Sequence, residues 1–421
     1  MCLSTPLKSL HPKRQVVITG MGIISPCGQT LKTFWKSVYK GKSGISRLKH
    51  LDQYHLPTKI GGYVKKFDPE KYLPARNLPR GRSCQFACAA SCDAIKDANF
   101  CAKTINPYRF GVMVGTSVSG LGNYENELNS FRIKGYMNPY TCISIFAGAT
   151  SSEIAIRFHA KGPSFTFSNG CTAGTDAIGN AFHAIRNGTC DVILCGGTEA
   201  PVTPAMMAGF CSLHVLSTRT CTPSKASCPF DASRDGMVLS EGAAMLVLED
   251  YDHAISRGAN IYGEIIGYAA TCDAHHMVRP AEDVEAAYQC MVQALQDARL
   301  QSSDIEAINA HGTSTQLNDL TETLAIKKLF GEKCEQIPVY AIKSITGHAI
   351  GASGAIETVA GVLGLNHNIL PPMVNLEHPD KNCDLNFVLK KKPADIKVLM
   401  KNSFGFGGKN ACLIIRKMCD K

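Results

Sequence analysis

Short β-branched stretches alternate with longer helical stretches along the whole chain of 421 residues. The pattern predicts strands at 15–19, 110–114, 164–167, 192–195, 243–248, 262–267, 305–309, 339–341 and 411–415. It predicts helices at 82–98, 172–186, 283–298, 319–330 and 351–366. Strands that alternate with helices in this way are typical of an α/β protein.

The two halves of the chain follow a similar order of elements. A glycine-bounded strand opens each half, at Val16 and again near Ile261, and the polar segment 252–260 lies between them. We therefore divide the chain into 1–259 and 260–421. Periodicity alone leaves open whether the fold is duplicated. After the first strand, Gly20-Met21-Gly22 is interpreted as a turn, although Ser25-Pro26 replaces the third glycine of a dinucleotide-binding fingerprint.

The composition excludes several classes of protein. With 45% hydrophobic residues and no long polar tract, the chain is not intrinsically disordered. The net charge is +9, but the basic residues are scattered, so we expect no nucleic-acid partner. The apolar stretch 16–24 is too short for a signal peptide or a membrane span, so we expect a soluble protein with no membrane association.

The chain has 19 cysteines, but no CxxC pair and no zinc-finger spacing. Cys84, Cys88 and Cys92 recur every fourth residue and would share one helix face. A soft-metal or redox site there is one interpretation; a buried face with Cys as a small hydrophobe is the favoured one. We therefore expect no metal. Many unpaired thiols indicate a reducing compartment, hence the cytoplasm.

The sharpest local feature surrounds Cys171. The predicted strand 164–167 meets a predicted helix through Asn169-Gly170, which places Cys171 at a strand–turn–helix elbow. A helix N-terminus beside the sulfur favours the thiolate, and we expect it to lower the thiol pKa to about 7.5 or below. This context favours a nucleophile over one more buried cysteine.

Two further polar motifs follow predicted strands, and a third precedes the last predicted strand. They are HGTST from His311, KSITGH from Lys343 to His348, and the glycine-rich NSFGFGG from Asn402. Ligands of α/β sheets bind at the carboxyl ends of strands, so these groups are expected to meet Cys171. A cysteine protease would need one imidazole oriented by Asn or Asp. Two imidazoles facing one thiol instead suit stabilisation of a developing enolate or oxyanion.

In their order and spacing, these four motifs resemble those of the β-ketoacyl-acyl-carrier-protein synthases, of the thiolase-like condensing-enzyme family. The resemblance extends from VVITGMGIISPCG to SFGFGGKNACLII and is to the elongating, type II branch. It implies an α/β fold of duplicated βαβαβ halves forming a five-layered α-β-α-β-α sandwich. It also implies an acyltransferase that performs a decarboxylative Claisen condensation on malonyl-acyl-carrier-protein.

The resemblance implies a role for each reacting group. Cys171 would hold the acyl chain as a thioester. His311 and His348 would hydrogen-bond the thioester oxygen of the malonyl unit as carbon dioxide leaves. The backbone N–H groups of Cys171 and Phe404 would form the oxyanion hole, and Phe404 would also gate entry.

Other residues would support this site. Lys343, Glu322 and Asp319 would form a buried polar network behind the His pair. Thr313 and Thr315 would bind the phosphopantetheine arm that the acyl carrier protein delivers, with no cofactor bound by the enzyme itself.

Val118 would line the acyl tunnel. The denser basic clusters would suit docking of the acidic carrier protein; their residues are Arg76, Arg80, Arg82, Arg132 and Lys134.

Within the family, GCTAGTDAIGNAF and EGAAMLVLEDYDHA favour the catalytic α ketosynthase of type II polyketide synthases, which implies a heterodimer with a chain-length-factor paralogue. NSFGFGGKN instead favours the alternative, a β-ketoacyl-acyl-carrier-protein synthase II of fatty-acid elongation, which implies a homodimer. A non-catalytic chain-length-factor-like subunit is disfavoured because such paralogues lose the elbow cysteine. A degradative thiolase is disfavoured because neither Cys412 nor Cys419 lies in a CxG setting.

Overall fold

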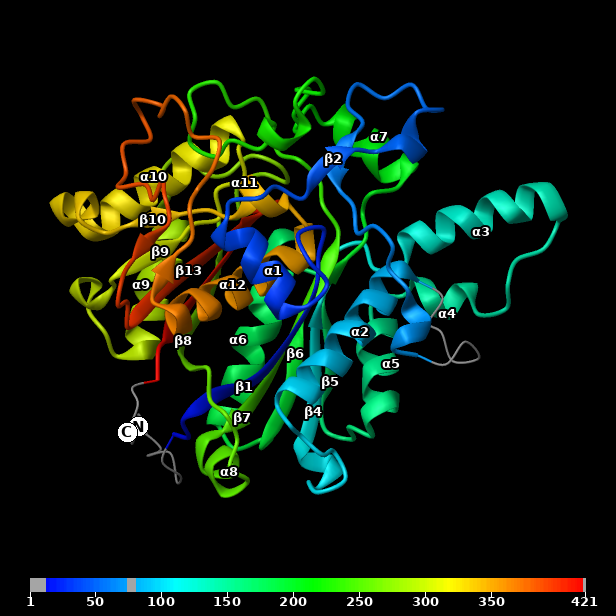
Figure 1. The fold of residues 1–421 in the computed structure, drawn as a ribbon, viewed down its shortest axis with the longest axis horizontal. Helices are drawn as coiled ribbons and strands as arrows, with labels where there is room; N and C mark the ends of the chain where they lie inside the picture. The colour runs from blue at the N-terminus through cyan, green and yellow to red at the C-terminus, as the bar shows by residue number, and fades with distance from the viewer. Residues whose placement is uncertain (1–12, 74–80, 419–421) are drawn as a thin grey trace, which may run out of the picture.

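The computed structural model describes residues 13–73 and 81–418. Its main feature is one mixed sheet of ten strands, in the order β10-β9-β13-β14-β8-β1-β7-β6-β4-β5 (Figure 1). The strands of the first half are β1 (Val16–Ile24), β4 (Phe110–Gly115), β5 (Ser164–Phe167), β6 (Val192–Glu199) and β7 (Gly242–Asp250). Those of the second half are β8 (Gly263–Cys272), β9 (Ala307–Asn309), β10 (Val339–Tyr340), β13 (Val398–Gly405) and β14 (Lys409–Arg416).

The strand pairing confirms the duplicated halves. From β1 outward, the pairs β1–β7 and β7–β6 are antiparallel, whereas β6–β4 and β4–β5 are parallel. From β8 outward, β8–β14 and β14–β13 are antiparallel, whereas β13–β9 and β9–β10 are parallel. The two half-sheets join through a short antiparallel contact that pairs Val16 with Ile265 and Ile18 with Gly263.

Helices cover both faces of each half-sheet and complete the predicted five layers. The middle layer is α6 (Ala173–Arg186) and α12 (Ser353–His367), which contact strands of both halves. The outer layers are α2 (Arg82–Asp97) and α5 (Ala149–Phe158) on one side, and α9 (Glu285–Ala298) and α10 (Gln316–Phe330) on the other. A fully enclosed helix must be apolar on every side, and α12 is buried from Ser353 to Leu365.

The remaining elements lie around this sandwich. Two small sheets pair β2 (Ile45–Arg47) with β3 (Ile60–Gly62) and β11 (Ile369–Leu370) with β12 (Lys392–Pro393). The shorter or peripheral helices are α1 (Leu31–Tyr39), α3 (Leu121–Lys134), α4 (Thr141–Ile145), α7 (Pro204–Ser212), α8 (Tyr251–Ser256) and α11 (Lys343–Thr346). Figure 1 shows α3 extending away from the body of the molecule.

The turn predicted at Gly20-Met21-Gly22 is wrong, because β1 continues to Ile24 with a register shift between Ile18 and Gly20. The glycines serve close packing against α2 instead. A Cβ added to Gly20 would lie 2.3 Å from the carbonyl oxygen of Ala94, and one added to Gly22 would lie 2.0 Å from that of Ala90. Gly20 and Gly22 therefore let α2 pack closely against β1, and neither serves a turn or a phosphate-binding loop.

The helix face with a cysteine at every fourth position packs into the core. Cys84 and Cys88 are buried on α2 among apolar side chains, as the favoured interpretation predicts, and Cys92 is half-buried. Across residues 13–73 and 81–418, the structure contains no helix long and apolar enough to cross a membrane.

Candidate active site

Cys171 lies in the single turn of 3-10 helix Gly170–Thr172, between β5 and α6. Gly170 has φ +63°, a left-handed conformation that glycine adopts without strain. Asp176, in the first turn of α6, accepts hydrogen bonds from Asn169 Nδ2 and Thr172 Oγ1, both at 2.8 Å. These contacts close the predicted elbow and fix the sulfur at the start of the helix.

The elbow does not lower the thiol pKa as the sequence led us to expect. Cys171 is buried, with an exposed fraction of 6%, and burial raises the pKa of its thiol to about 11, although the positive charge of Lys343 opposes the change. Desolvation of the thiolate outweighs the favourable charges around it. The resting sulfur therefore carries its proton and needs a neighbouring base.

His348 provides that base. Its Nε2 lies 3.0 Å from Cys171 Sγ, and its Nδ1 lies 2.8 Å from the hydroxyl oxygen of Ser353. Burial lowers the pKa of His348 well below its usual value, and Lys343 and Lys401 lower it further. The imidazole is thus neutral and able to accept the thiol proton. A hydroxyl both donates and accepts, so Ser353 fits either tautomer of this ring.

His311 is held differently. The ammonium of Lys343 lies 3.0 Å from His311 Nδ1 and 2.6 Å from its carbonyl oxygen. An ammonium only donates, so Nδ1 must accept and the ring hydrogen must lie on Nε2. That Nε2 is buried and hydrogen-bonds to none of the described residues. Burial lowers the pKa of His311 well below its usual value, so the ring is neutral. The two imidazoles stand edge to face, with centroids 5.3 Å apart.

The carboxylate that pairs with Lys343 was missed in the sequence. It is Glu357, on α12, which also lies 3.1 Å from the buried Lys401 on β13. The sequence signal was present, because Glu357 is the one acidic or basic residue among Asp, Glu, Lys and Arg in α12, and Lys401 is the one in β13. We expected Glu322 and Asp319 in this place.

Glu322 and Asp319 support the loop that carries His311 through its backbone. Glu322 accepts the N–H groups of His311 and Gly312, both at 2.8 Å, and burial raises its pKa to about 7. Asp319 accepts those of Thr313 at 3.0 Å and Ser314 at 3.2 Å.

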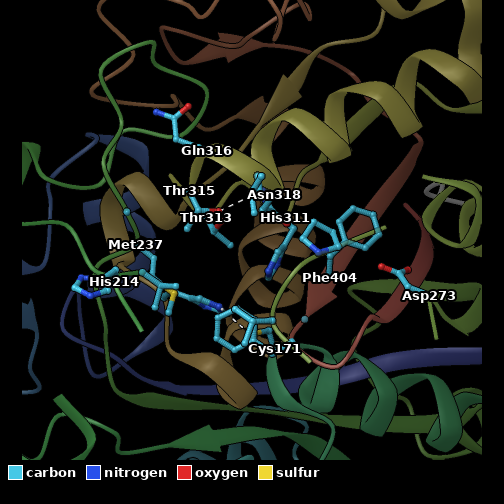
Figure 2. Close-up of a pocket in the computed structure, with 18 of the residues that line it drawn as sticks. Cys171, His214, Met237, Asp273, His311, Thr313, Thr315, Gln316, Asn318 and Phe404 are labelled. Carbon is cyan, nitrogen blue, oxygen red and sulfur yellow. Dashed lines mark hydrogen bonds between the residues drawn. The ribbon is translucent and has the colours of Figure 1, made fainter. Parts of the chain in front are cut away.

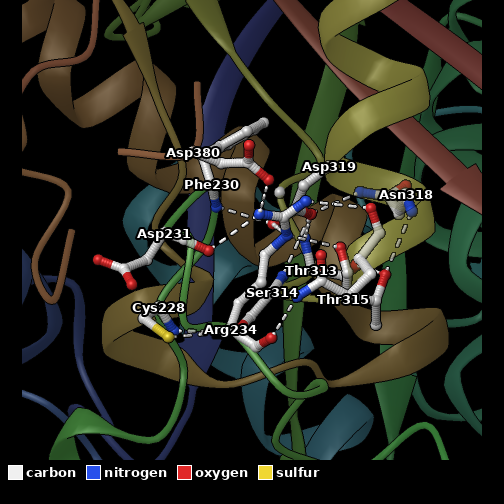
Figure 3. Close-up of polar contacts among 12 residues, drawn as sticks. Cys228, Phe230, Asp231, Arg234, Thr313, Ser314, Thr315, Asn318, Asp319 and Asp380 are labelled. Carbon is white, nitrogen blue, oxygen red and sulfur yellow. Dashed lines mark hydrogen bonds and ion pairs between the residues drawn. The ribbon is translucent and has the colours of Figure 1, made fainter. Parts of the chain in front are cut away.

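Arg234 anchors this loop from the other side, as Figure 3 shows. Its guanidinium is buried, donates to the carbonyls of Thr315 and Gln316, and pairs with Asp380 at 2.8 Å and Asp319 at 3.6 Å. Arg234 was not singled out in the sequence.

The reactive groups share one cavity of about 250 Å³ (Figure 2). Cys171, His311 and His348 line it, together with Thr313 and Thr315, whose hydroxyl oxygens lie 2.9 Å apart. With Phe404, six of the residues singled out in the sequence line this cavity. The ring of Phe404 lines the same cavity and packs edge-on against His311, with centroids 6.2 Å apart.

One backbone amide of the glycine-rich motif faces the sulfur. It belongs to Phe406, whose backbone N–H hydrogen-bonds to Cys171 and favours the thiolate. Gly405 makes this approach possible, because a Cβ there would lie 3.1 Å from the backbone nitrogen of Cys171. The glycine-rich motif offered two phenylalanines, and only the folded loop shows which one turns its amide inward.

Other predicted residues lie apart from the cavity. Val118 is half-buried in the loop after β4, where its N–H binds Glu199 at 3.0 Å, and it is not among the residues that line the cavity. Arg82 does not present a free cation, because both oxygens of the buried Glu241 accept from it at 2.7 and 3.0 Å. Arg132 and Lys134 are exposed at the end of α3.

The remaining two predicted docking residues, Arg76 and Arg80, lie outside the described residues.

The donor atoms of the site are poorly suited to hold a metal ion. One donor atom from each of Cys171, His311 and His348 lies within 4.8 Å of the others, a spacing that an ion could bridge. The ammonium of Lys343 directly behind His311 opposes a second cation. The site fits neutral hydrogen-bond donors, and we assign no metal or cofactor to it.

Comparison with known proteins identifies the family. Residues 13–254 match the N-terminal domain of beta-ketoacyl synthases, and residues 262–377 match their C-terminal domain. A 3-oxoacyl-[acyl-carrier-protein] synthase 2 of Synechocystis sp. is 42% identical over 96% of this chain and 98% of its own length. The enzyme of the same name from Coxiella burnetii is 39% identical over 97% of this chain and 100% of its own.

Solved structures agree. A type II polyketide synthase acyl-carrier protein in complex with its ketosynthase contains a chain with TM-score 0.90 and 34% identity, covering 96% of this chain and 100% of that one. The ishigamide ketosynthase/chain length factor matches with TM-score 0.90 and 31% identity over 97% of this chain and 100% of its own. The chain therefore belongs to the β-ketoacyl synthase family and is a condensing acyltransferase with the thiolase-like fold.

Proposed function

We propose that this chain elongates an acyl group held on Cys171 by condensing it with malonyl-acyl-carrier-protein. One observation carries the proposal. Cys171 contacts the neutral imidazole of His348, and the imidazole of His311, whose tautomer is fixed by Lys343, lines the same cavity. The reaction then has two half-reactions, and each uses the histidines in a different way.

In the first half-reaction, Cys171 attacks the thioester carbonyl of the incoming acyl chain. The thiol proton passes to His348 Nε2 and from there to the departing pantetheine sulfur. A new C–S bond forms to Cys171 while the bond to pantetheine breaks. The N–H of Phe406 faces Cys171 and, with the N–H of Cys171 itself, suits the negative charge that develops on the carbonyl oxygen.

In the second half-reaction, the malonyl carboxylate leaves as carbon dioxide, and its electron pair passes to the adjacent carbon. Nε2–H of His311 donates to the thioester oxygen and stabilises the enolate. After the sulfur is acylated, the neutral ring of His348 loses its Nδ1 hydrogen and gains one on Nε2 by exchange with solvent, while Ser353 turns to donate to Nδ1. Nε2–H of His348 then donates to the same oxygen. The carbanion attacks the acyl carbonyl, the C–S bond to Cys171 breaks, and the released thiolate takes up a proton. Two neutral donors are suited to a charge that appears only in the transition state.

The pantetheine arm must reach Cys171 through the cavity. Thr313 and Thr315 line it, and their paired hydroxyls can each turn to an amide of the arm. Of the predicted docking residues that the structure describes, Arg132 and Lys134 are exposed and can face an acidic carrier protein. Such a partner is supported by the similar ketosynthase whose solved structure is a complex with its acyl-carrier protein.

We favour fatty-acyl elongation over polyketide synthesis for this chain. The curated relatives named 3-oxoacyl-[acyl-carrier-protein] synthase 2 are 37–42% identical to it, whereas the two polyketide-type structures are 31–34% identical. This supports the alternative of the two subtypes considered from the sequence, and with it a homodimer. The free cysteines throughout the described chain support a reducing compartment such as the cytoplasm.

An exposed apolar surface supports self-association. The edge strand β5 presents Phe165, which is 55% exposed, and α5, which packs against β5, presents Ile156, which is 75% exposed. Further exposed apolar side chains follow on α3, α4 and the connections around them: Phe131, Ile133, Tyr136, Tyr140, Ile143 and Phe146. An unpaired strand edge with apolar neighbours is a typical place for a second chain to pair.

Intact-protein mass spectrometry tests the proposal. The chain is mixed alone with a saturated acyl-carrier donor and then with malonyl-loaded carrier protein. We expect an acyl adduct on Cys171, its loss on addition of the malonyl carrier, and a β-ketoacyl carrier as product. Loading that occurs only with a Cys-less paralogue would favour the polyketide subtype. No loading in either setting would contradict the catalytic proposal.

A further inference from the structure

The chain places a second buried lysine behind the reactive groups. Lys401 is fully buried on β13, and its ammonium lies 2.9 Å from Thr175 Oγ1 and 3.1 Å from Glu357 Oε2 and also donates to Ser403 Oγ. Thr175 belongs to α6, the helix that begins beside Cys171. Lys401 therefore connects three elements of the site: α6, α12 and β13.

Glu357 is shared between two cations. One carboxylate oxygen pairs with Lys343 and the other faces Lys401, and all three side chains are at most 1% exposed. Two ammonium groups and one carboxylate leave one excess positive charge in the interior. Buried ion pairs are often no more stabilising than packed apolar residues, so stability alone does not account for this arrangement.

The contacts form a continuous chain toward the reacting atoms. Lys401 forms an ion pair with one oxygen of Glu357 that accepts no hydrogen bond from the described residues, Lys343 donates to the other oxygen, and Lys343 also donates to His311 Nδ1. His348 is outside this chain, because Ser353 holds its Nδ1. A change at Lys401 is thus transmitted to one histidine by contact and to the other only by charge.

We propose that Lys401 is a positioning residue, which through Glu357 fixes Lys343 against His311 and keeps His311 Nε2–H directed at the malonyl thioester oxygen. This rests on the proposed condensation. Without Lys401, Glu357 is free to turn both oxygens toward Lys343 and to draw its ammonium away from Nδ1. The loss falls on decarboxylation, where His311 acts, rather than on acylation of Cys171.

The positive charge of Lys401 has a second consequence. It lowers the pKa of His311, together with burial and the charge of Lys343, while Glu357 supports the charge on Lys401 against burial. Removal of this charge raises the pKa of His311, so protonation inactivates the ring at a higher pH. The described charged or titratable groups around the two imidazoles include Lys343, Lys401, Glu199, Glu322, Glu357 and Cys171. His214, Asp235 and Asp273 line the same cavity and are unchanged in the variants below.

The test compares Lys401→Met with the wild-type chain. We expect decarboxylation of malonyl-acyl-carrier-protein to fall about 10- to 100-fold, as for a small displacement of a catalytic group. Alkylation of Cys171 by iodoacetamide should change little. The acid limb of the decarboxylation profile should move upward by roughly half to one pH unit, the size expected for loss of one nearby charge.

Two further variants separate the charge from the packing. Lys401→Gln keeps a hydrogen-bond donor without the charge and serves if Lys401→Met does not fold. Thr175→Val removes the link to α6 but keeps the charge, so the acid limb should stay where it is in the wild type. Melting temperatures measured beside the rates report the structural cost of each change.

An acid limb that does not move, with both half-reactions slowed equally or not at all, would overturn the proposal and leave Lys401 a structural residue. If the wild-type chain itself neither decarboxylates the malonyl carrier nor loads an acyl group, the proposed condensation fails instead.

Discussion

The two histidines of the site differ in what holds the far side of each imidazole. Lys343 holds His311, and an ammonium allows only one tautomer, with the hydrogen on Nε2. Ser353 holds His348, and a hydroxyl allows both tautomers. The structure thus separates a permanent hydrogen-bond donor from a ring that can first accept the thiol proton and later donate. The difference teaches that two residues of one type can divide two half-reactions between them.

Removal of either imidazole should have the largest effect on the rates of the two half-reactions. We expect His348→Ala to slow both acylation of Cys171 and decarboxylation, and His311→Ala to slow decarboxylation alone. Each affected rate should fall about 10²- to 10⁴-fold, the usual contribution of a positioned acid or base. Stopped-flow acyl transfer and carbon dioxide release measure the two steps separately. Equal loss of acylation in both variants would contradict the division of roles.

Lys343→Met should affect most strongly the half-reaction that depends on a fixed tautomer. Without the ammonium, His311 Nδ1 can carry the hydrogen and Nε2 can lose it, so decarboxylation should fall about 10²-fold. Acylation of Cys171, measured by intact mass over time, should fall by less than decarboxylation, because Lys343 acts on Cys171 and His348 by charge alone. A variant that loses acylation to the same extent would show that Lys343 acts on the whole site.

Ser353→Ala removes the hydroxyl that serves both tautomers of His348. The loss of one hydrogen bond should slow acylation about two- to tenfold, because its net contribution is about 0.5–1.5 kcal/mol. Ser353→Thr keeps the hydroxyl and is the matched control. A rate that is unchanged in Ser353→Ala and reduced in Ser353→Thr would indicate that packing at this position matters and the hydrogen bond does not.

The smallest expected effect is that of pH on the wild-type chain. Burial lowers the pKa of both imidazoles, and the neutral rings are the active forms. Decarboxylation should therefore stay constant as the pH falls through about 6.5, where an ordinary histidine titrates, and decline only well below it. By linkage, the unfolded chain binds more protons below that pH, so stability should decrease there as well. A decline centred near the ordinary histidine value would contradict neutral, buried rings.

The sequence predicted the parts of the molecule that depend on local patterns. The alternation of strands and helices, the Cys171 elbow and the two histidine motifs each lie within a short stretch, and the structure places them as expected. The duplication became certain only from strand pairing, because pairing joins segments far apart in the chain.

The misses share a physical cause. Glu357 and Lys401 meet only when α12 packs beside β13. The local sequence around either residue therefore does not show that the two form an ion pair. The pKa of Cys171 depends on how deeply the elbow is buried, and burial outweighs the local effect of a helix terminus. Gly20 was interpreted by type as a turn residue, whereas its neighbour across the core, α2, decides its use.

The most direct test of the contrast between the histidines is ¹⁵N NMR of the imidazole nitrogens, with His311→Ala and His348→Ala spectra for assignment. We expect His311 to show the Nε2–H tautomer throughout, before and after alkylation of Cys171. His348 should change its Nε2 signal when the sulfur is alkylated, because its proton-sharing partner is then gone. A His311 ring with its hydrogen on Nδ1, or a His348 ring that does not respond to alkylation, would contradict the division between a fixed and an exchangeable donor.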